Sequence, residues 1–272
     1  MGELPTLPTI YMKLSHLLNE SEPSIKTISG IISEDLAIAA MVLKIVNSAA
    51  YGFRNKIGDL QHAIVILGLK EIRNLVLASS IYKIVKEFES SSAFNMQEFW
   101  KHSIGCATLA RVLAETTHLK SPEDVFTAGL LHDIGKLIHA GHLHEEFDAV
   151  MADVAETGSQ MSKSEKKILG FDHAQTGGAL AEKWGLPRET VNMITHHHLS
   201  YTPNALTKEM AAIHIGNTLC IALGLGSGGE KRVPLINQNA WEILGLRLSD
   251  LEYVMQRSSK LFEDSVSIMD FE

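Results

Sequence analysis

The sequence predicts an all-α protein. No proline occurs between Pro23 and Pro122, and apolar residues recur in that stretch with the 3.6-residue period of a helix. No segment shows the sustained apolar–polar alternation, bounded by turn residues, that is typical of a half-buried strand. Several later stretches have the composition of helix N-termini.

Two strongly periodic segments lie in the N-terminal half. In LAIAAMVLKIVN (36–47), apolar residues three and four apart share one face of a predicted helix. AIVILGLKEIRNLVLASSIYKIV (63–85) predicts a second, mostly buried helical run, in which Gly68 is a candidate break.

Helix starts are better marked in the C-terminal half. SPED (121–124) places a cap residue before a proline and two acidic residues. Ser162 and Glu165 have the spacing of a capping box. Asp172 is a candidate cap for a helix that carries His173 in its first turn.

The best candidate junction is SSSA (90–93). We therefore expect residues 1–93 to form one helical subdomain and residues 94–272 a histidine-rich helical core, together one unit. The glycine-rich GLGSGGEK (224–231) lacks the Gly-Lys-Ser/Thr ending of a phosphate loop and follows no strand, so it predicts a flexible loop.

Composition narrows the function classes. The chain has 272 residues and a formal net charge of −8, which disfavours nucleic acid as a partner. Cys106 and Cys220 are too few for a disulfide framework or a thiolate zinc site. No apolar run is long enough to span a membrane, and the start, MGELPTLPTI, does not resemble a signal peptide, so we expect a cytoplasmic protein.

The apolar run AGLLHDIGKL (128–137) ends in titratable residues. His132 and Asp133 are adjacent and Lys136 follows three residues later. Burying such side chains costs free energy unless they are paired. A metal ion, a hydrogen-bond network or surface exposure could each meet that need.

Further candidate ligands lie nearby in the sequence. Glu98 and His102 are four residues apart and share a helix face, while His173 and the run 196–198 add imidazoles. Imidazole and carboxylate together suit iron, manganese, nickel or zinc. A carboxylate can bridge two ions, and two-metal sites hydrolyse phosphoesters. The sequence leaves open whether these helices converge.

Other polar residues have simpler interpretations. A nucleophilic pair of Cys106 and His102 is conceivable, but a thiol on a helix face is usually a core residue. Six histidines are interpreted as ordinary core or surface residues: His16, His62, His118, His139, His142 and His144.

AGLLHDIGKL resembles the signature of the HD superfamily of metal-dependent phosphohydrolases. FWKHSIGCATLARVLA (99–114) and FDHAQTGGALAEKWGLPRETVNMITHHH (171–198) resemble the flanking helices of its HD-GYP and HDOD branches. LPTLPTI (4–10), VLKIVNSAAYGF (42–53), LQHAIVILGLKEIRNLVLAS (60–79) and WEILGL (241–246) resemble the HDOD branch, and the likeness covers roughly residues 3–260. It implies an N-terminal helical bundle packed on an HD-type helical core, in a bacterial signalling protein.

The resemblance also implies a ligand set. Matched to the HD-GYP pattern, the metal ligands are Glu98, His102, His132, Asp133, His173, His197 and His198. The alternative pair of consecutive histidines is His196 and His197, and counting from Ile194 favours His197 and His198. If the protein is active, Asp133 bridges the metals and Lys136 stabilises negative charge on a phosphate.

Two departures from the HD-GYP pattern follow. Asn217 stands where the family has its last ligand, an Asp, and a neutral amide binds a cation more weakly. The Gly-Tyr-Pro segment is missing from HHHLSYTP (196–203), which argues against cleavage of cyclic diguanylate.

We therefore expect a regulatory HDOD module without robust hydrolase activity. It would bind one or two divalent ions, iron or manganese first and nickel or zinc as alternatives. Its partner would be a signalling protein or a nucleotide-type messenger. The alternatives are a metal-dependent phosphohydrolase acting on a nucleotide or cyclic dinucleotide, and a protein whose histidines are purely structural.

Overall fold

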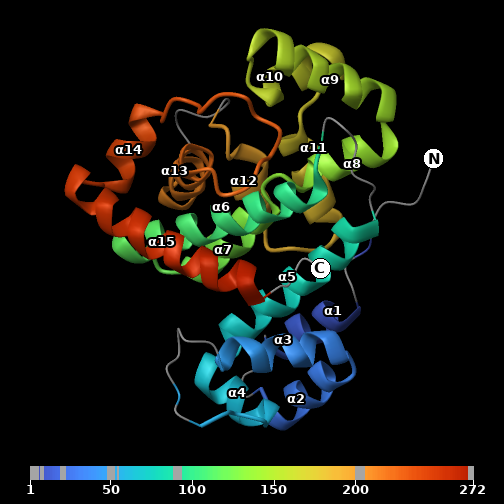
Figure 1. Cartoon of the computed structure of the whole chain (residues 1–272), viewed down its shortest axis with the longest axis vertical. Helices are drawn as coiled ribbons and strands as arrows, with labels where there is room; N and C mark the ends of the chain where they lie inside the picture. The colour runs from blue at the N-terminus through green and yellow to red at the C-terminus, as the bar shows by residue number, and fades with distance from the viewer. Residues whose placement is uncertain are drawn as a thin grey trace. The chain divides into compact units, whose positions relative to one another are not determined.

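The computed structural model describes residues 6, 9–18, 23–47, 53, 55–87, 94–199 and 206–268. Within these ranges it contains fifteen helices and no strand, which confirms the all-α prediction (Figure 1). The chain divides into two compact units: residues 5–84 with 263–272, and residues 1–4 with 85–262. The junction expected at 90–93 lies outside the described residues.

The smaller unit is built from short capped helices. Its helices are α1 (Thr9–Leu18), α2 (Ile25–Ser33), α3 (Leu36–Val46), α4 (Leu60–Leu67) and most of α5 (Leu69–Glu87). The side chains of Ser24, Asp35 and Asp59 accept hydrogen bonds from the first backbone N–H groups of α2, α3 and α4.

Both periodic segments of this unit are helical, as predicted. The helix expected at 36–47 is α3, and the run at 63–85 is divided between α4 and α5. Gly68 separates them with φ of +81°, a conformation that a residue with a Cβ rarely adopts. Local sequence therefore determines both helices and the break.

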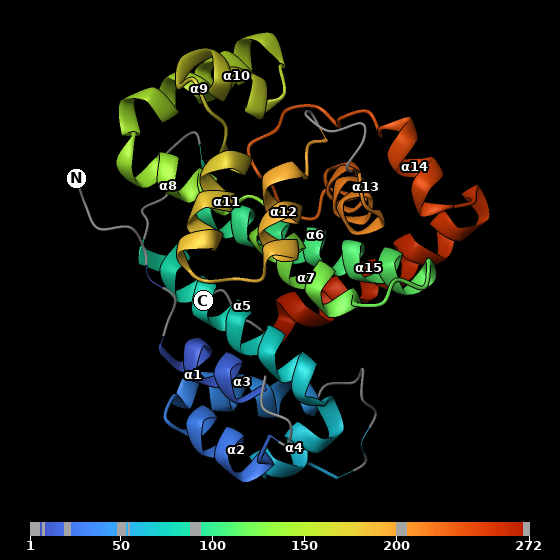
Figure 2. The same ribbon diagram turned by 180° about the vertical axis from the view of Figure 1, so that it is seen from behind.

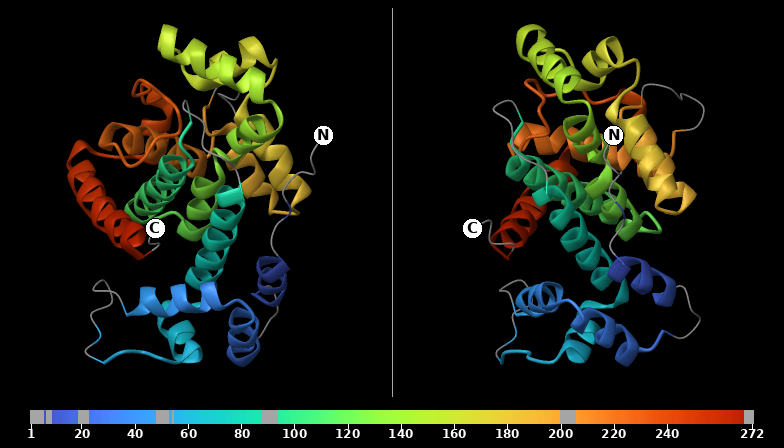
Figure 3. Two further views of the ribbon diagram at one scale, coloured as in Figure 1. Left: turned by 45° about the vertical axis from the view of Figure 1, so that its right-hand side comes forward. Right: turned by 90° about the vertical axis from the view of Figure 1, so that its right-hand side faces the viewer.

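The larger unit surrounds one long helix, α6 (Met96–Thr116), which packs against α7 and α13 (Figure 2). The other helices are α7 (Pro122–Leu131), α8 (Ile134–His142), α9 (His144–Thr157), α10 (Met161–Ile168), α11 (His173–Lys183), α12 (Arg188–His196), α13 (Lys208–Leu223), α14 (Gln238–Leu244) and most of α15 (Leu248–Ile268). The neighbouring helices α9 and α10 pack together (yellow-green in Figure 3). Among the described helices, none combines the length and apolar character that crossing a bilayer requires.

Two of the three predicted helix starts are confirmed. Pro122 begins α7, and Asp172 forms a capping box with Gln175 at the start of α11. The predicted capping box of Ser162 and Glu165 is wrong, because α10 begins at Met161 with Gln160 as its N-cap, so Ser162 lies inside the helix. The Glu165 side chain is buried and bonds to histidines instead.

Close contact between α8 and α11 depends on Gly135. An ideal Cβ built on this residue would lie 2.1 Å from the backbone oxygen of His173 and 2.8 Å from the backbone nitrogen of Gly177. Only glycine therefore lets the two helices approach this closely. The approach matters because Asp133 precedes α8 and His173 begins α11.

Replacing Gly135 with alanine should lower the free energy of unfolding by about 2 kcal/mol or more, since backbone atoms cannot yield as a flexible side chain can. Gly30 in α2 is the control, because no atom lies within 4 Å of its ideal Cβ position. Gly30→Ala should stabilise its helix by roughly 0.5–1 kcal/mol. Urea unfolding followed by circular dichroism measures both, and equal stability of the Gly135→Ala protein and the parent would contradict the packing argument.

Candidate metal centre

The apolar run 128–137 spans the end of α7 and the start of α8. His132 is the C-cap residue of α7 and Asp133 is the residue before α8. Both are almost fully buried. His132 Nδ1 lies 2.7 Å from the backbone oxygen of Gly129. This hydrogen bond makes Nδ1 the donor, so the lone pair lies on Nε2.

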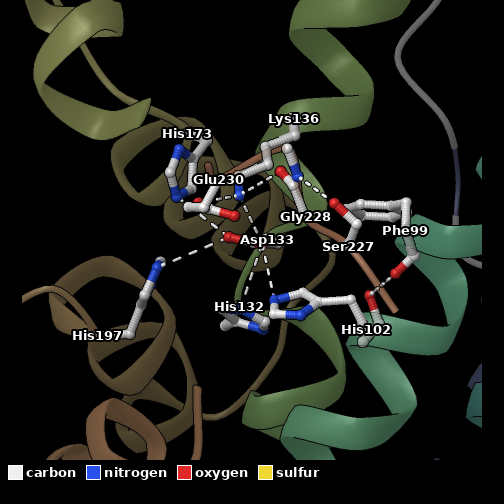
Figure 4. A network of polar contacts seen from close by, with 12 residues as sticks. Phe99, His102, His132, Asp133, Lys136, His173, His197, Ser227, Gly228 and Glu230 are labelled. Carbon is white, nitrogen blue, oxygen red and sulfur yellow. Dashed lines mark hydrogen bonds and ion pairs between the residues drawn. The ribbon is translucent and has the colours of Figure 1, made fainter. Parts of the chain in front are cut away.

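The carboxylate of Asp133 is the centre of the cluster (Figure 4). Its Oδ2 lies 3.3 Å from His132 Nε2 and 3.5 Å from His102 Nε2. Its Oδ1 lies 3.1 Å from His173 Nε2 and 3.8 Å from His197 Nε2. Each oxygen of the carboxylate therefore faces a different pair of imidazoles.

Two ligand groups result from this arrangement. One contains His102, His132 and Asp133, and the other contains His173, His197 and His198; within each, the candidate ligand atoms lie within 4.8 Å of one another. In the second group, His198 Nε2 lies 2.8 Å from His173 Nε2. These residues come from α6, from the start of α11, from the residues that follow the end of α12 and from the α7–α8 junction, so the structure brings together helices whose convergence the sequence left open.

Several nitrogen atoms in the cluster lack hydrogen-bond partners. They are Nε2 of His102, His132 and His197, all buried. Buried polar atoms are normally hydrogen-bonded, so a group of exceptions requires an explanation. Imidazole nitrogens directed at a shared carboxylate match the ligand chemistry of iron, manganese, nickel and zinc. The residues present therefore fit a divalent metal ion.

Glu165 orients one of the imidazoles. Its carboxylate lies 2.5 Å from His173 Nδ1 and accepts a hydrogen bond of 2.9 Å from the His173 backbone N–H. It also lies 3.0 Å from His139 Nδ1, and His139 Nε2 lies 2.8 Å from Thr176 Oγ1. A carboxylate behind a histidine is the usual way in which metal-binding imidazoles are oriented.

Burial and neighbouring charges set the protonation states. Burial raises the pKa of Asp133, but His132, Lys136 and His173 lower it well below its ordinary value. Burial lowers the pKa of His197 and His198, so both imidazoles are neutral, as metal ligands must be.

The Glu165–His173 pair is charged. Burial opposes the charge on both groups, yet their attraction outweighs it, so the pKa of Glu165 falls to about 2 and the pKa of His173 rises to about 9. A metal ion that took the His173 Nε2 lone pair would therefore displace a proton.

Lys136 is fully buried and uses all its donors within the protein. Its Nζ lies 2.7 Å from Asp133 Oδ2, 2.8 Å from Glu230 Oε1 and 2.9 Å from the Gly228 backbone oxygen. A lysine ammonium has three N–H donors and no acceptor. Every donor thus has an acceptor within the chain.

Glu98, which the resemblance placed in the ligand set, lies outside both ligand groups. The Glu98 side chain is 40% exposed and its Oε1 accepts from Lys101 Nζ at 2.7 Å. Asn217 is buried in α13, and its Oδ1 has no hydrogen-bond partner. Of the alternative histidines, His198 belongs to a ligand group and His196 does not.

The two cysteines do not form a nucleophilic site. Cys106 is fully buried, and burial raises its pKa well above the ordinary value. The thiol beside His102 is that of Cys220, with Sγ 3.5 Å from His102 Nδ1, and burial raises its pKa as well. Both side chains are therefore thiols, which are poor nucleophiles.

Sequence reasoning missed three contributors to this site. Glu165 was interpreted as a cap residue, His139 as an ordinary histidine, and Glu230 as part of a flexible loop. The only local signal for Glu230 is an acidic residue at the end of a glycine-rich segment. For Glu165, the contact to His139 bridges 26 residues and carries no sequence signature.

Replacing Glu165 with glutamine should weaken metal binding about 10- to 100-fold, because His173 loses its charged acceptor. Asp153→Asn is the control: this carboxylate accepts from Ser164 and Lys167 and contacts none of the histidines. Titration of each purified protein with Mn²⁺ measures the affinity. An equal loss in both variants would show that Glu165 acts only through general stability.

His198→Ala should reduce metal binding at the group that contains His173, because it removes the imidazole 2.8 Å from His173 Nε2. His196→Ala removes the same side chain from the adjacent turn and should leave metal content unchanged. Elemental analysis of the two variants beside the parent decides between them. Loss of metal only in the His196 variant would restore the alternative pair.

Comparisons with known proteins agree with the fold. The family model for the HDOD domain matches residues 4–200. An HDOD domain protein of unknown function from Geobacter sulfurreducens superposes with a TM-score of 0.82, at 26% identity over 99% of this chain and 93% of that one. A candidate phosphohydrolase from Shewanella amazonensis gives 0.75, at 25% identity over 97% and 93% of the two chains.

A curated relative, an uncharacterized protein of Treponema pallidum, is 24% identical over 80% of this chain. The match spans 42% of that relative, so the chain corresponds to less than half of it. The family model covers well over half of this chain, and the two solved structures named above are nearly coextensive with it. The chain therefore belongs to the HDOD domain family.

Proposed function

We propose that the protein is a regulatory module of a signalling system that holds divalent metal in the Asp133 cluster and does not hydrolyse phosphoesters at an enzymatic rate. A protein partner or a nucleotide-type messenger would be recognised by the fold. Membership of the HDOD family supports the signalling role. The hydrogen bonds of the buried Lys136 ammonium support the lack of phosphoester hydrolysis.

Lys136 carries the argument against hydrolysis. In a phosphohydrolase, its ammonium would have to stabilise the charge that develops on the phosphate. Here its three donors are bonded to Asp133, Glu230 and the Gly228 carbonyl, and the side chain has no exposed surface. A phosphate could bind Lys136 only by displacing one of these three acceptors, of which Glu230 is a side chain that is not itself a partner of the histidine groups.

The donor set supports iron or manganese first, with nickel and zinc as alternatives, in one or two positions. A bound ion would supply Lewis-acid charge and would activate water when a substrate had access. In the metal-binding role proposed here, His102, His132 and Asp133 would hold one position, and His173, His197 and His198 would hold the other.

The alternative function is a metal-dependent phosphohydrolase acting on a nucleotide or cyclic dinucleotide. The complete pair of histidine groups around Asp133 favours it, as does the similarity to the candidate phosphohydrolase from Shewanella amazonensis. In that case Asp133 would separate the two positions and Lys136 would hold the phosphate after releasing Glu230.

Elemental analysis of the tag-free protein should find at least one equivalent of iron, manganese, nickel or zinc. A His132→Ala/Asp133→Ala variant should lose that metal. A chelator should lower the unfolding temperature of the parent and not that of the variant, because an ion that binds only the folded state stabilises it. A metal-free parent with the same unfolding temperature in chelator would refute the metal-binding role.

Hydrolysis is tested on the same samples. The metal-loaded parent, incubated with a panel of nucleotides and cyclic dinucleotides, should release product no faster than the double variant does. Turnover at an enzyme-like rate, about 1 s⁻¹ or more, that is lost in the double variant would establish the phosphohydrolase instead.

A further inference from the structure

The glycine-rich segment 224–230 contributes to the metal centre, although the sequence suggested only a flexible loop. It follows α13 and returns to α6 at the turn that carries Glu98 and His102. The Ser227 backbone N–H donates to the Glu98 backbone oxygen at 2.9 Å. An ideal Cβ on Gly226 would lie 2.3 Å from the backbone nitrogen of His102 and 2.5 Å from the backbone oxygen of Glu98. Glycine is therefore required for this contact.

Gly228 brings the same segment onto Asp133. An ideal Cβ on Gly228 would lie 2.8 Å from Asp133 Oδ2, 2.8 Å from Glu230 Oε2 and 3.0 Å from Lys136 Nζ. These three atoms thus surround one point beside the Gly228 backbone. The segment places the Glu230 carboxylate next to the oxygen of Asp133 that faces His102 and His132 (Figure 4).

One oxygen of Glu230 has no partner. Oε1 accepts from Lys136, whereas Oε2 is buried and has no hydrogen bond. An unpaired carboxylate oxygen in a buried site costs free energy unless a cation or donor meets it. His102 Nε2 and His132 Nε2, beside the same oxygen of Asp133, also lack hydrogen-bond partners.

The charge at the position of His102 and His132 favours a second carboxylate ligand. The position defined by His102 and His132 has two imidazoles and one oxygen of a shared carboxylate, and the Lys136 ammonium offsets the charge of that carboxylate from 2.7 Å. Glu98, the sequence-based candidate for the missing anion, is paired with Lys101 and partly exposed. Glu230 is the buried acid that remains beside the site.

We propose that Glu230, supplied by the glycine-rich segment, is the carboxylate ligand of the metal position formed by His102, His132 and Asp133, in place of Glu98. This inference rests on the proposed metal-binding function. Lys136 then links the two acids of this position through its hydrogen bonds to Asp133 and Glu230.

The test compares Glu230→Gln with Glu98→Gln, which make the same chemical change. Glutamine retains the size of the side chain and an oxygen that can accept from Lys136. Mn²⁺ is titrated into each metal-free protein, and free Mn²⁺ is measured by electron paramagnetic resonance. We expect Glu230→Gln to weaken one of the two positions by more than about tenfold, because losing even an outer partner of a ligand costs that much. Glu98→Gln should bind as the parent does.

Three results would overturn the inference. Glu230→Gln could bind Mn²⁺ as the parent does, or Glu98→Gln could be the variant that loses a position. Glu230→Gln could also gain affinity for inorganic phosphate with Mn²⁺ binding unchanged, which would make Glu230 only the counter-ion of Lys136. In all three cases the parent still binds metal, so the proposed function stands. A parent that binds none of manganese, iron, nickel and zinc would refute both.

A crystal of the Mn²⁺-loaded parent provides a measurement that needs no variant. An anomalous peak in direct contact with a Glu230 oxygen, His102 and His132 supports the inference, also if Glu230→Gln fails to fold. A peak in contact with Glu98, or one that leaves Glu230 bonded to Lys136 alone, overturns it.

Discussion

The carboxylate of Asp133 is the constraint on which the larger unit depends. It is 1% exposed, so its charge must be compensated inside the protein. The compensation comes from distant parts of the chain: His102 on α6, Lys136 on α8, and His173 at the start of α11. The helices that pack the core are thus the helices that deliver the ligands, and the close approach at Gly135 serves packing and chemistry together.

The negative charge of the buried carboxylates can be offset either by protonated side chains or by a metal ion bound at the same atoms. Without an ion, the cluster is held by the Lys136 ammonium and by a protonated His173, whose pKa the charge of Glu165 raises to about 9 despite burial. A divalent ion on His173 would replace that proton and take over part of the role of the ammonium. Lys136 and His173 thus offset two of the three buried carboxylate charges of Asp133, Glu165 and Glu230, and a metal ion would add positive charge to a network that already exists.

Sequence predicted what local interactions decide. The helix α3, the break at Gly68, the helix start at Pro122 and the cap at Asp172 follow from residues within one or two turns of each other. Helical spacing also placed Glu98 beside His102. Spacing cannot decide whether the Glu98 side chain points toward the cluster or toward Lys101. Glu230 reaches Lys136 across 94 residues, and only the glycines of its segment make that approach possible. Such a contact is a property of the packed chain.

Glu230 connects the question of activity to the question of metal binding. As long as it occupies Lys136, a phosphate has no ammonium to bind, so a site with a nearly complete histidine set can bind metal and remain inactive. The acid that blocks the phosphate position also supplies the negative charge that this metal position lacks when Glu98 turns to Lys101. In this arrangement, the Glu230 side chain both blocks phosphate binding at Lys136 and contributes a ligand to the metal position. A messenger or partner that moved the segment 224–230 would change both at once.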